Sequence, residues 1–273
     1  MTFEEVNDDL GLSMKPYRVV ACLAVHGRLP LLKHTIERLY KKNGCYKVVC
    51  AGDGQEEKKL CDSLGAIWTP HRNKPLGMKW NAAFQRAKDF NPDAVVFVGS
   101  SDWLSDNWFQ VMWPYVERYG FAGVPGCSLL DIGESVRAVA WPGYRGYRAE
   151  REDECIGIGR MLSRRLMEAI DWTPFDPQSN NSLDRSMKDR SAIRDYVDFM
   201  IHDTSLTALS LSTSGPYKWP KDQKNKHDFE MHWTNIIPSE KINPELIINK
   251  FPEANDLIDA LKNYPRLRQQ VNR

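Results

Sequence analysis

Residues 17–28 read YRVVACLAVHGR. The first nine are almost continuously apolar and rich in β-branched residues, which predicts a strand buried on both faces of a parallel sheet. Pro30 then suits the first turn of a helix, and the apolar residues up to Tyr40 recur at the spacing of one helical face. The stretch therefore predicts the first strand-and-helix unit of an α/β fold.

Three further apolar runs repeat this pattern. They predict strands at 47–51, 66–69 and 94–98, with helices at 55–64 and around 80–87. Four such repeats within about 100 residues are typical of an α/β layer with parallel strands and right-handed crossovers. After Phe121 the rhythm is lost, and the sequence predicts paired strands at 121–141, helices at 160–170 and 183–196, and more strand at 197–212.

The composition fits one globular domain over all 273 residues. Apolar residues make up 42% and charged residues 27%, and the net charge of +1 provides no overall field that would attract nucleic acid or an anionic membrane. We expect three parts within it, at 17–108, at 109–250, and at 251–273, the last a C-terminal helix and tail.

The cysteine pattern and the lack of a recognisable targeting signal predict a cytoplasmic protein, which would be in the host cytoplasm if the protein is viral. The six cysteines are irregularly spaced with no C-x-x-C, which favours reduced thiols. Residues 1–12 are acidic and do not resemble a secretory signal. The longest apolar run, 19–25, is much shorter than the roughly 20 residues of a membrane span.

Polar residues follow each predicted strand. Ligands of open parallel sheets bind beyond the carboxyl ends of the strands, so these residues are the first candidates for a site. They lie at 26–28, 52–54, 71–73 and 100–102. No G-x-G-x-x-G follows the first strand and no G-x-x-x-x-G-K-[ST] occurs, which argues against dinucleotide redox chemistry and P-loop phosphoryl transfer.

Four segments together resemble the GT-A glycosyltransferases, specifically the broad family 2-like group. They are CLAVHGR at 22–28, GDG at 52–54, PLGMKWNAAF at 75–84 and VFVGSSDWLSDNW at 96–108. The resemblance implies a Rossmann-like α/β/α sandwich with a mostly parallel central sheet and an irregular acceptor-side C-terminal part. It also implies a hexosyl- or pentosyltransferase that uses a nucleotide-sugar donor, with a UDP-sugar favoured. In such an enzyme 17–108 would be the nucleotide-sugar-binding (donor) half and 109–250 the acceptor-side half.

The family's D-x-D turn maps onto residues 100–102, where Ser100 replaces the first carboxylate. Asp102 would bind Mn²⁺ or Mg²⁺, whose charge stabilises the leaving nucleotide diphosphate. Family members commonly add a late histidine, for which His202, His227 and His232 are candidates. Alternatively, an Asp after a strand caps the next helix.

The resemblance also implies a set of donor-binding residues. Asp53 would contact the nucleobase or ribose, and Lys79 and Asn81 begin a helix whose N-terminus favours anions. A turn at Asp53 and an ordinary solvated helix face are the alternatives. The full set is Ala24, His26, Arg28, Asp53, Lys79, Asn81, Ser100, Ser101 and Lys218.

Two later segments resemble the part that closes over the sugar and the acceptor-side turn, at 154–160 and 180–184. Inverting members keep a base in that turn, which takes the proton of the acceptor hydroxyl. Asp184 is the candidate base, and Asp153 and Glu154 are the alternatives. A helix cap at Asp184 is the structural alternative.

The sequence does not identify the acceptor. Compact chains with a GSSDWL-like turn resemble glycosyltransferases of bacterial viruses, some of which modify hydroxymethylated pyrimidines in DNA. Basic clusters could meet DNA phosphates. A glycan or lipid-linked acceptor is the alternative, as are an inactive domain that only binds a nucleotide-sugar or glycan, and a sugar nucleotidyltransferase. The clusters are Arg145, Arg148 and Arg151; Arg160, Arg164 and Arg165; and Arg266, Arg268 and Arg273.

Overall fold

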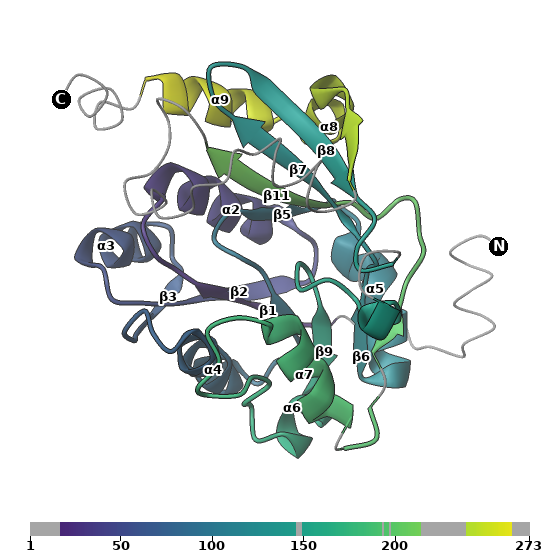
Figure 1. Ribbon diagram of the computed structural model, residues 1–273. Coiled ribbons are helices and arrows are strands. Elements are labelled where there is room, and N and C mark those ends of the chain that lie inside the picture. Colours follow the sequence, from purple (N-terminus) through teal and green to yellow (C-terminus); the bar gives the residue numbers. More distant parts are fainter. Residues whose placement is uncertain (1–16, 146–148, 193, 197, 214–238, 264–273) are drawn as a thin grey trace.

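Two sheets organise the computed structural model, which describes residues 17–145, 149–192, 194–196, 198–213 and 239–263. The main sheet has seven strands, in the order β10 (Phe199–Met200), β6 (Phe121–Gly123), β9 (Met161–Ser163), β4 (Ala94–Phe97), β1 (Val19–Ala24), β2 (Cys45–Gly52) and β3 (Ile67–Pro70) (Figure 1). Strands β1, β2, β3 and β4 run parallel, whereas β9 is antiparallel to both of its neighbours. The predicted mostly parallel central sheet is confirmed.

Strand β1 is buried on both faces. Val19, Ala21 and Leu23 point into one hydrophobic cluster, and Val20 and Cys22 point into another. All five are fully buried. Because successive side chains of a strand point to opposite faces, the continuous apolar run at 17–25 is what a central strand covered by helices on both sides requires.

Helices cover both faces of the main sheet (Figure 1). One face packs against α4 (Leu76–Ala87), α6 (Arg164–Ala169) and α7 (Leu183–Ala192), with the short η1 (Lys88–Phe90) following α4. The other face packs against α2 (Leu29–Lys41), α3 (Gln55–Ser63) and α5 (Trp108–Tyr119). The architecture is therefore an α/β/α sandwich, as predicted.

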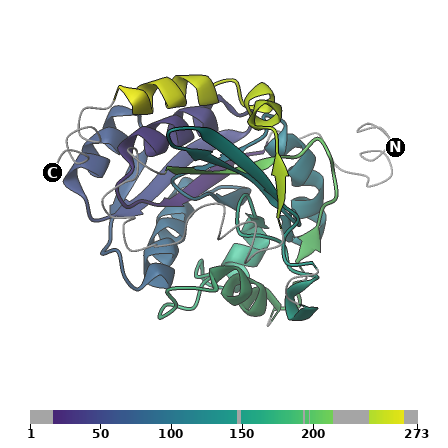
Figure 2. The same ribbon diagram turned by 45° about the horizontal axis from the view of Figure 1, so that its top comes forward.

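A second sheet of five strands lies beyond α2. Its order is β12 (Glu240–Ile242), β8 (Val136–Trp141), β7 (Cys127–Ile132), β11 (Ala208–Thr213) and β5 (Asp102–Leu104). Helices α8 (Pro244–Lys250) and α9 (Ala254–Lys262) cover its outer face (Figure 2). The sheet takes β5 from the predicted donor half and β11 from the predicted acceptor half, so it joins the two.

An ion-pair cluster around the buried Arg38 fastens the C-terminal helices to the rest of the chain. The Arg38 guanidinium contacts Glu253 and lies 2.9 Å from Asp106, and it sits over the rings of Trp103 and Phe251 at 5.2 and 5.0 Å. Arg38 is almost fully buried on α2. Glu253 precedes α9, which lies within the range 251–273 predicted for a C-terminal helix and tail, whereas α8 lies before that range.

Several predicted elements differ from the structure. Residues 160–170 were predicted to be one helix, but Met161–Ser163 forms β9 and only Arg164–Ala169 is helical. Ser163 starts α6 by accepting a hydrogen bond from Leu166 N, so the helix cannot extend back into the strand. The strand predicted at 197–212 is two separate strands, β10 and β11, and the helix predicted at 183–196 ends at Ala192.

The described residues contain neither a membrane-spanning helix nor a disulfide bond. No helix within the described residues is long and apolar enough to cross a membrane. All six cysteines lie in the described residues as free thiols, and five of them are buried. The division at 17–108, 109–250 and 251–273, like the single domain and the cytoplasmic location, stays a prediction.

We predict that the buried thiols make the protein sensitive to alkaline pH. Burial raises the pKa of Cys22, Cys127 and Cys155 and takes that of Cys45 to about 12, while a hydrogen bond with Cys61 and burial raise the pKa of Cys50. Above about pH 9 the unfolded chain loses these protons and the folded chain keeps them, so each group destabilises the fold by about 1.4 kcal/mol per pH unit.

Lys42 opposes this trend, because burial lowers its pKa to about 8. Above about pH 8 the folded chain has released this proton and the unfolded chain still holds it, so this group adds stability as the pH rises. Urea unfolding at pH 7, 8, 9 and 10 should therefore show a net loss of roughly 5 kcal/mol per pH unit above pH 9. Cys45→Ala should reduce that slope. A free energy of unfolding that stays level up to pH 10 would contradict the prediction.

Candidate active site

The carboxyl ends of β1, β2 and β4 lie at one edge of the main sheet, where polar side chains form hydrogen bonds with backbone groups. Gly27 N donates to Glu57 Oε1 at 2.7 Å, and Glu57 itself lies against Gly54, so close that a Cβ on Gly54 would overlap the carboxylate. Arg28 follows in the left-handed conformation, with φ of 53°. The turn after β1 is therefore fixed, and it directs Arg28 toward the segment after β4.

Asp102 is held at this edge by both of its carboxylate oxygens. Oδ2 accepts from Gly99 N at 2.9 Å, and Oδ1 accepts from Ser210 Oγ at 2.9 Å. Arg28 Nη1 donates to Ser101 Oγ at 3.3 Å and is close enough to favour the charged Asp102. Burial nevertheless raises the pKa of Asp102, against the opposing hydrogen bonds from Ser210 and Gly99.

His26 and Asp53 face each other across the ends of β1 and β2. Their side chains approach to 3.9 Å, and they are 38% and 47% exposed. Both can therefore contact a ligand in solution. Ala24, the last residue of β1, is partly buried beside them. These predicted donor-binding residues come together, along with Arg28, Ser100 and Ser101.

Lys79 and Asn81 lie in the same region but are engaged in holding the fold. The Lys79 ammonium contacts Val25 O and donates to Asn73 Oδ1 at 2.9 Å, and Lys79 is 1% exposed. Asn81 bonds to both backbone groups of Phe175, at 2.9 and 3.1 Å. Both side chains therefore make hydrogen bonds within the protein: Lys79 contacts the end of β1, and Asn81 bonds to the backbone of Phe175 in the acceptor half.

The N-terminus of α4 is closed rather than open to an anion. Leu76 N donates to Asn180 Oδ1 at 3.1 Å, and Gly77 N donates to Ser179 O at 2.8 Å. A Cβ at position 77 would lie 2.0 Å from Asp176 O. The loop at 176–180 therefore supplies the partners that the first helical N–H groups need.

Asp184 lies in the first turn of α7, facing Tyr144 and Gly157. Its Oδ2 accepts from Tyr144 Oη at 2.7 Å and from Gly157 N at 3.0 Å. Its charge also raises the pKa of Asp102, although burial is the larger cause. The candidate base and the candidate metal ligand are thus close enough to interact electrostatically.

The two alternative bases have other partners. Glu154 is fully buried and accepts hydrogen bonds from Arg151 Nε and Nη2 at 2.7 and 2.5 Å, and it lies 3.5 Å from Arg160. Asp153 is 81% exposed and pairs with Lys188 at 2.9 Å, a hydrogen bond that lowers its pKa. Neither is placed as Asp184 is, beside the segment that carries Asp102.

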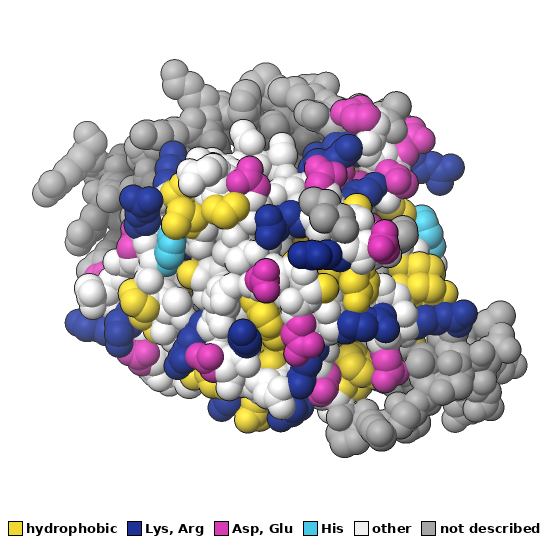
Figure 3. Space-filling model, turned by 90° about the horizontal axis from the view of Figure 1, so that it is seen from below, with side chains coloured by type: hydrophobic (Ala, Val, Ile, Leu, Met, Phe, Trp, Pro, Cys, Tyr) yellow, Lys and Arg dark blue, Asp and Glu magenta, His cyan; other side chains and the backbone are white. Residues whose placement is uncertain are grey.

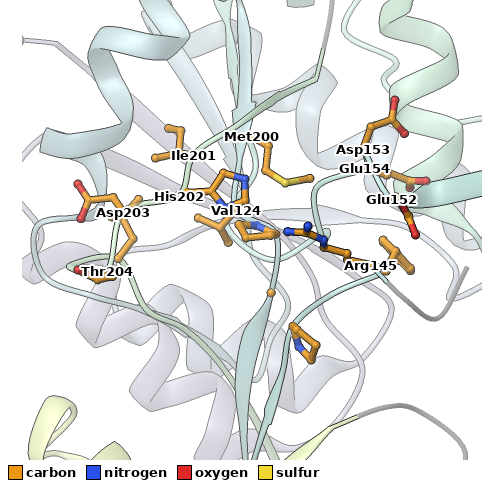
Figure 4. A pocket seen from close by; sticks show the side chains of 15 residues that line it. Val124, Arg145, Glu152, Asp153, Glu154, Met200, Ile201, His202, Asp203 and Thr204 are labelled. Carbon is orange, nitrogen blue, oxygen red and sulfur yellow. The ribbon is translucent and has the colours of Figure 1, made fainter. Parts of the chain in front are cut away.

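A cavity of about 700 Å³ adjoins this region, and Tyr144 is part of its wall. Figure 4 shows Met200 to Thr204 on one side and Arg145 with Glu152 to Glu154 on the other. His202 lies in this wall, which Asp102 does not line. The cavity is large enough for a small ligand and reaches the residue that contacts Asp184.

Asp102 is the candidate carboxylate for a divalent ion at the edge of the main sheet. No group of three or more His, Cys, Asp or Glu side chains that could hold a metal occurs among the described residues. Mg²⁺ is often bound through one carboxylate together with substrate phosphates and water, so Asp102 fits such an ion. Lys218 and His227, and the further candidate His232, lie outside the described residues.

The residues that sequence reasoning missed are Tyr144, Gly157 and Ser210. Tyr144 and Ser210 lie 40 and 108 positions from the carboxylates that they contact. No local pattern marks such partners. For Gly157 the only signal was its place in the segment ECIGIGR, which the resemblance had marked as closing over the sugar.

Comparison with known proteins identifies the fold. No protein-family profile matches the sequence, and no curated protein does. Among solved structures, the chain is similar to the mannosyltransferase PcManGT from Pyrobaculum calidifontis in complex with GDP-Man and Mn²⁺, with 12% identity, a TM-score of 0.51, and coverage of 77% of this chain and 63% of that one. Residues 1–349 of TarS from S. aureus match with 12% identity, a TM-score of 0.49, and coverage of 71% and 60%.

This chain has the GT-A fold, a mixed α/β architecture with a mostly parallel central sheet. At 12% identity the similarity describes the fold alone. The chain spans less than two thirds of the length of these solved structures. Its activity, donor and acceptor therefore have to be argued from its own residues.

We predict that Asn81 stabilises the protein rather than binding the donor. Asn81→Ala would leave the N–H and C=O of Phe175 without their partners, at a cost of about 2–4 kcal/mol. Urea unfolding measures this loss. Asn107→Ala, which removes an exposed bond to Ser205, is the matched control and should change stability by no more than about 0.5 kcal/mol. Equal stability of the two variants would refute the prediction.

Proposed function

We propose that this protein is a glycosyltransferase that moves a sugar from a nucleotide-sugar donor to an acceptor hydroxyl. The observation that carries the proposal is that Asp102, at the end of the donor half, and Asp184, in the acceptor half, lie within electrostatic range of each other in a GT-A fold. The reaction requires one group near the leaving diphosphate and another near the attacking hydroxyl. Asp102 and Asp184 meet that requirement.

The donor binds, in this proposal, at the ends of β1 and β2. Asp53 and His26 contact the nucleoside, since both are partly exposed and face each other. Arg28, beside Ser101 and Asp102, supplies positive charge for the diphosphate. Lys79 acts indirectly, because it holds Val25 O at the end of β1. A UDP-sugar is the first donor to test.

Asp102 would hold Mn²⁺ or Mg²⁺ together with donor phosphates. Such an ion neutralises charge on the leaving diphosphate when bound. Ser210 and Gly99 keep the carboxylate in place, each using one lone pair of one oxygen. A carboxylate oxygen retains a second lone pair, so Asp102 has capacity left for a cation.

Asp184 acts as general base in a single displacement. The acceptor oxygen forms a bond to the anomeric carbon, the bond from that carbon to the diphosphate oxygen breaks, and Asp184 takes the hydroxyl proton. The 700 Å³ cavity, which Tyr144 joins to Asp184, is the proposed place of the acceptor. Its wall carries Glu152, Asp153 and Asp203, which do not favour a polyanion.

A hydroxymethylated pyrimidine in phage DNA is the acceptor that the sequence suggested, and the described residues give it less support. Arg151 and Arg160 are committed to Glu154, and Arg164 lies 3.8 Å from Asp93. Figure 3 shows basic and acidic side chains interspersed on the face seen from below. Arg148 and the basic tail lie outside the described residues. A glycan or another neutral hydroxyl compound is therefore the preferred acceptor.

We predict metal-dependent stabilisation by one nucleotide-sugar. Thermal unfolding with UDP-, GDP-, CDP- and TDP-sugars, with and without Mn²⁺, should raise Tm by about 5 °C for one donor at 100 times its Kd. Asp102→Ala should lose the Mn²⁺-dependent part. Asp62→Ala, an exposed carboxylate on α3 paired with Lys58, is the control and should behave as wild type.

A donor that stabilises without Mn²⁺, equally in Asp102→Ala, would remove the metal role and leave the donor site. No stabilisation by any donor would contradict the proposal of a nucleotide-sugar site. Stabilisation by a donor without nucleotide release would instead identify a domain that binds but does not catalyse.

We predict that Asp184→Asn slows nucleotide release and transfer about 10²- to 10⁴-fold, because an amide cannot take the proton. Acceptors for the assay are simple glycans and hydroxymethylcytosine-containing DNA. Asp189→Asn, an exposed carboxylate on the same helix that pairs with Arg185, is the matched control. Equal rates in the two variants would rule out Asp184 as the base.

A further inference from the structure

The candidate base is held through one of its two carboxylate oxygens. Oδ2 of Asp184 accepts two hydrogen bonds, from Tyr144 Oη at 2.7 Å and from Gly157 N at 3.0 Å. Within the part of the chain that the structure describes, Oδ1 accepts none. A carboxylate with one oxygen bonded twice has a defined plane, and its other oxygen is left for a substrate.

We propose that Tyr144 is a positioning residue that turns the Asp184 carboxylate so that Oδ1 faces the acceptor hydroxyl. The inference rests on the proposed function, since it assigns a role to a residue beside the proposed base. Tyr144 touches Asp184 and lines the cavity proposed for the acceptor. It therefore connects the place where the acceptor binds with the atom that receives its proton.

Tyr144 is itself held firmly by neighbours. The Arg151 guanidinium lies 3.6 Å above its ring, and Trp141 meets the ring edge-to-face with centroids 5.3 Å apart. Glu154 fixes Arg151 through two hydrogen bonds and lies 3.5 Å from the fully buried Arg160. The phenol hydroxyl thus has a fixed location, which is what positioning a base requires.

Gly157 sets the other side of the carboxylate. A Cβ at this position would lie 2.5 Å from Asp184 Oδ1 and 3.1 Å from the Phe97 ring. Only a residue without a side chain lets the carboxylate lie flat against the backbone and accept from its N–H. Tyr144 and Gly157 therefore fix the carboxylate together, by a hydroxyl on one side and a backbone N–H on the other.

The test compares two substitutions that each remove one phenol hydroxyl. Tyr144→Phe keeps the ring under Arg151 and removes the bond to Asp184, whereas Tyr40→Phe removes a bond of 2.8 Å to Gly65 O, far from the site in the sequence and in the fold. Nucleotide release is measured with the UDP-, GDP-, CDP- and TDP-sugar panel, and kcat and the donor KM are determined with the donor that turns over.

We expect Tyr144→Phe to lower kcat about 10- to 100-fold with the donor KM within about twofold of wild type, because a misplaced base slows the chemical step without weakening donor binding. Tyr40→Phe should leave both constants unchanged. Gly157→Ala, which displaces Oδ1, should lower kcat in the same way. Thermal unfolding of each variant confirms that it is folded.

Equal kcat for Tyr144→Phe and Tyr40→Phe in an active wild-type background would overturn the inference alone and leave the proposed function standing. A raised donor KM with unchanged kcat would also overturn it, because Tyr144 would then bind the donor. A wild-type protein that releases nucleotide from no donor would overturn the proposed function and this inference with it.

Discussion

The burial of β1 on both faces is the constraint on which the rest of the structure depends. Where a strand with no exposed face ends, its backbone N–H and C=O groups need hydrogen-bond partners within the protein. At its carboxyl end, Val25 N donates to Ala51 O, and Val25 O accepts from Lys79. Two residues on, Gly27 N donates to Glu57. Polar side chains at this edge of the sheet therefore close the end of the strand, and His26, Arg28 and Asp53 lie beside them, where we propose that the donor binds.

The second sheet brings the two halves of the site together. Asp102 is the first residue of β5, and β5 pairs with β11 rather than with a strand of the main sheet. Ser210, on β11, holds the carboxylate of Asp102, so a residue of the acceptor half fixes the candidate metal ligand of the donor half. Gly157 and Asp184 make a similar link between the segment before β9 and α7. Each candidate carboxylate is therefore oriented by a part of the chain remote from its own.

The donor half of the fold could be predicted because its signals are local. The apolar runs at 17–25 and 94–98 predict strands that are buried on both faces, and the spacing of the apolar residues after them predicts the helices. The triplet Met-Leu-Ser at 161–163 gives no such signal, because it becomes a strand only by pairing with residues 94–96 and 121–122. The same limit applies to the site. Asp184 was predicted from its surrounding motif, whereas the partners of Asn81 and Glu154, which are Phe175 and the pair Arg151 and Arg160, are visible only in three dimensions.

The buried charges around Glu154 are best explained by geometry rather than by stability. Removing Arg160, Glu154 and Asp198 from water costs free energy that their mutual attraction scarcely recovers, and apolar residues of similar size often serve a core equally well. What apolar residues cannot do is donate hydrogen bonds in fixed directions. Arg160 Nη1 donates to Asp184 O at 2.7 Å and Nε donates to Ile156 O at 2.9 Å, so one guanidinium ties the first turn of α7 to the segment that carries Gly157. We interpret this network as the support that keeps the candidate base in register with its two hydrogen-bond donors.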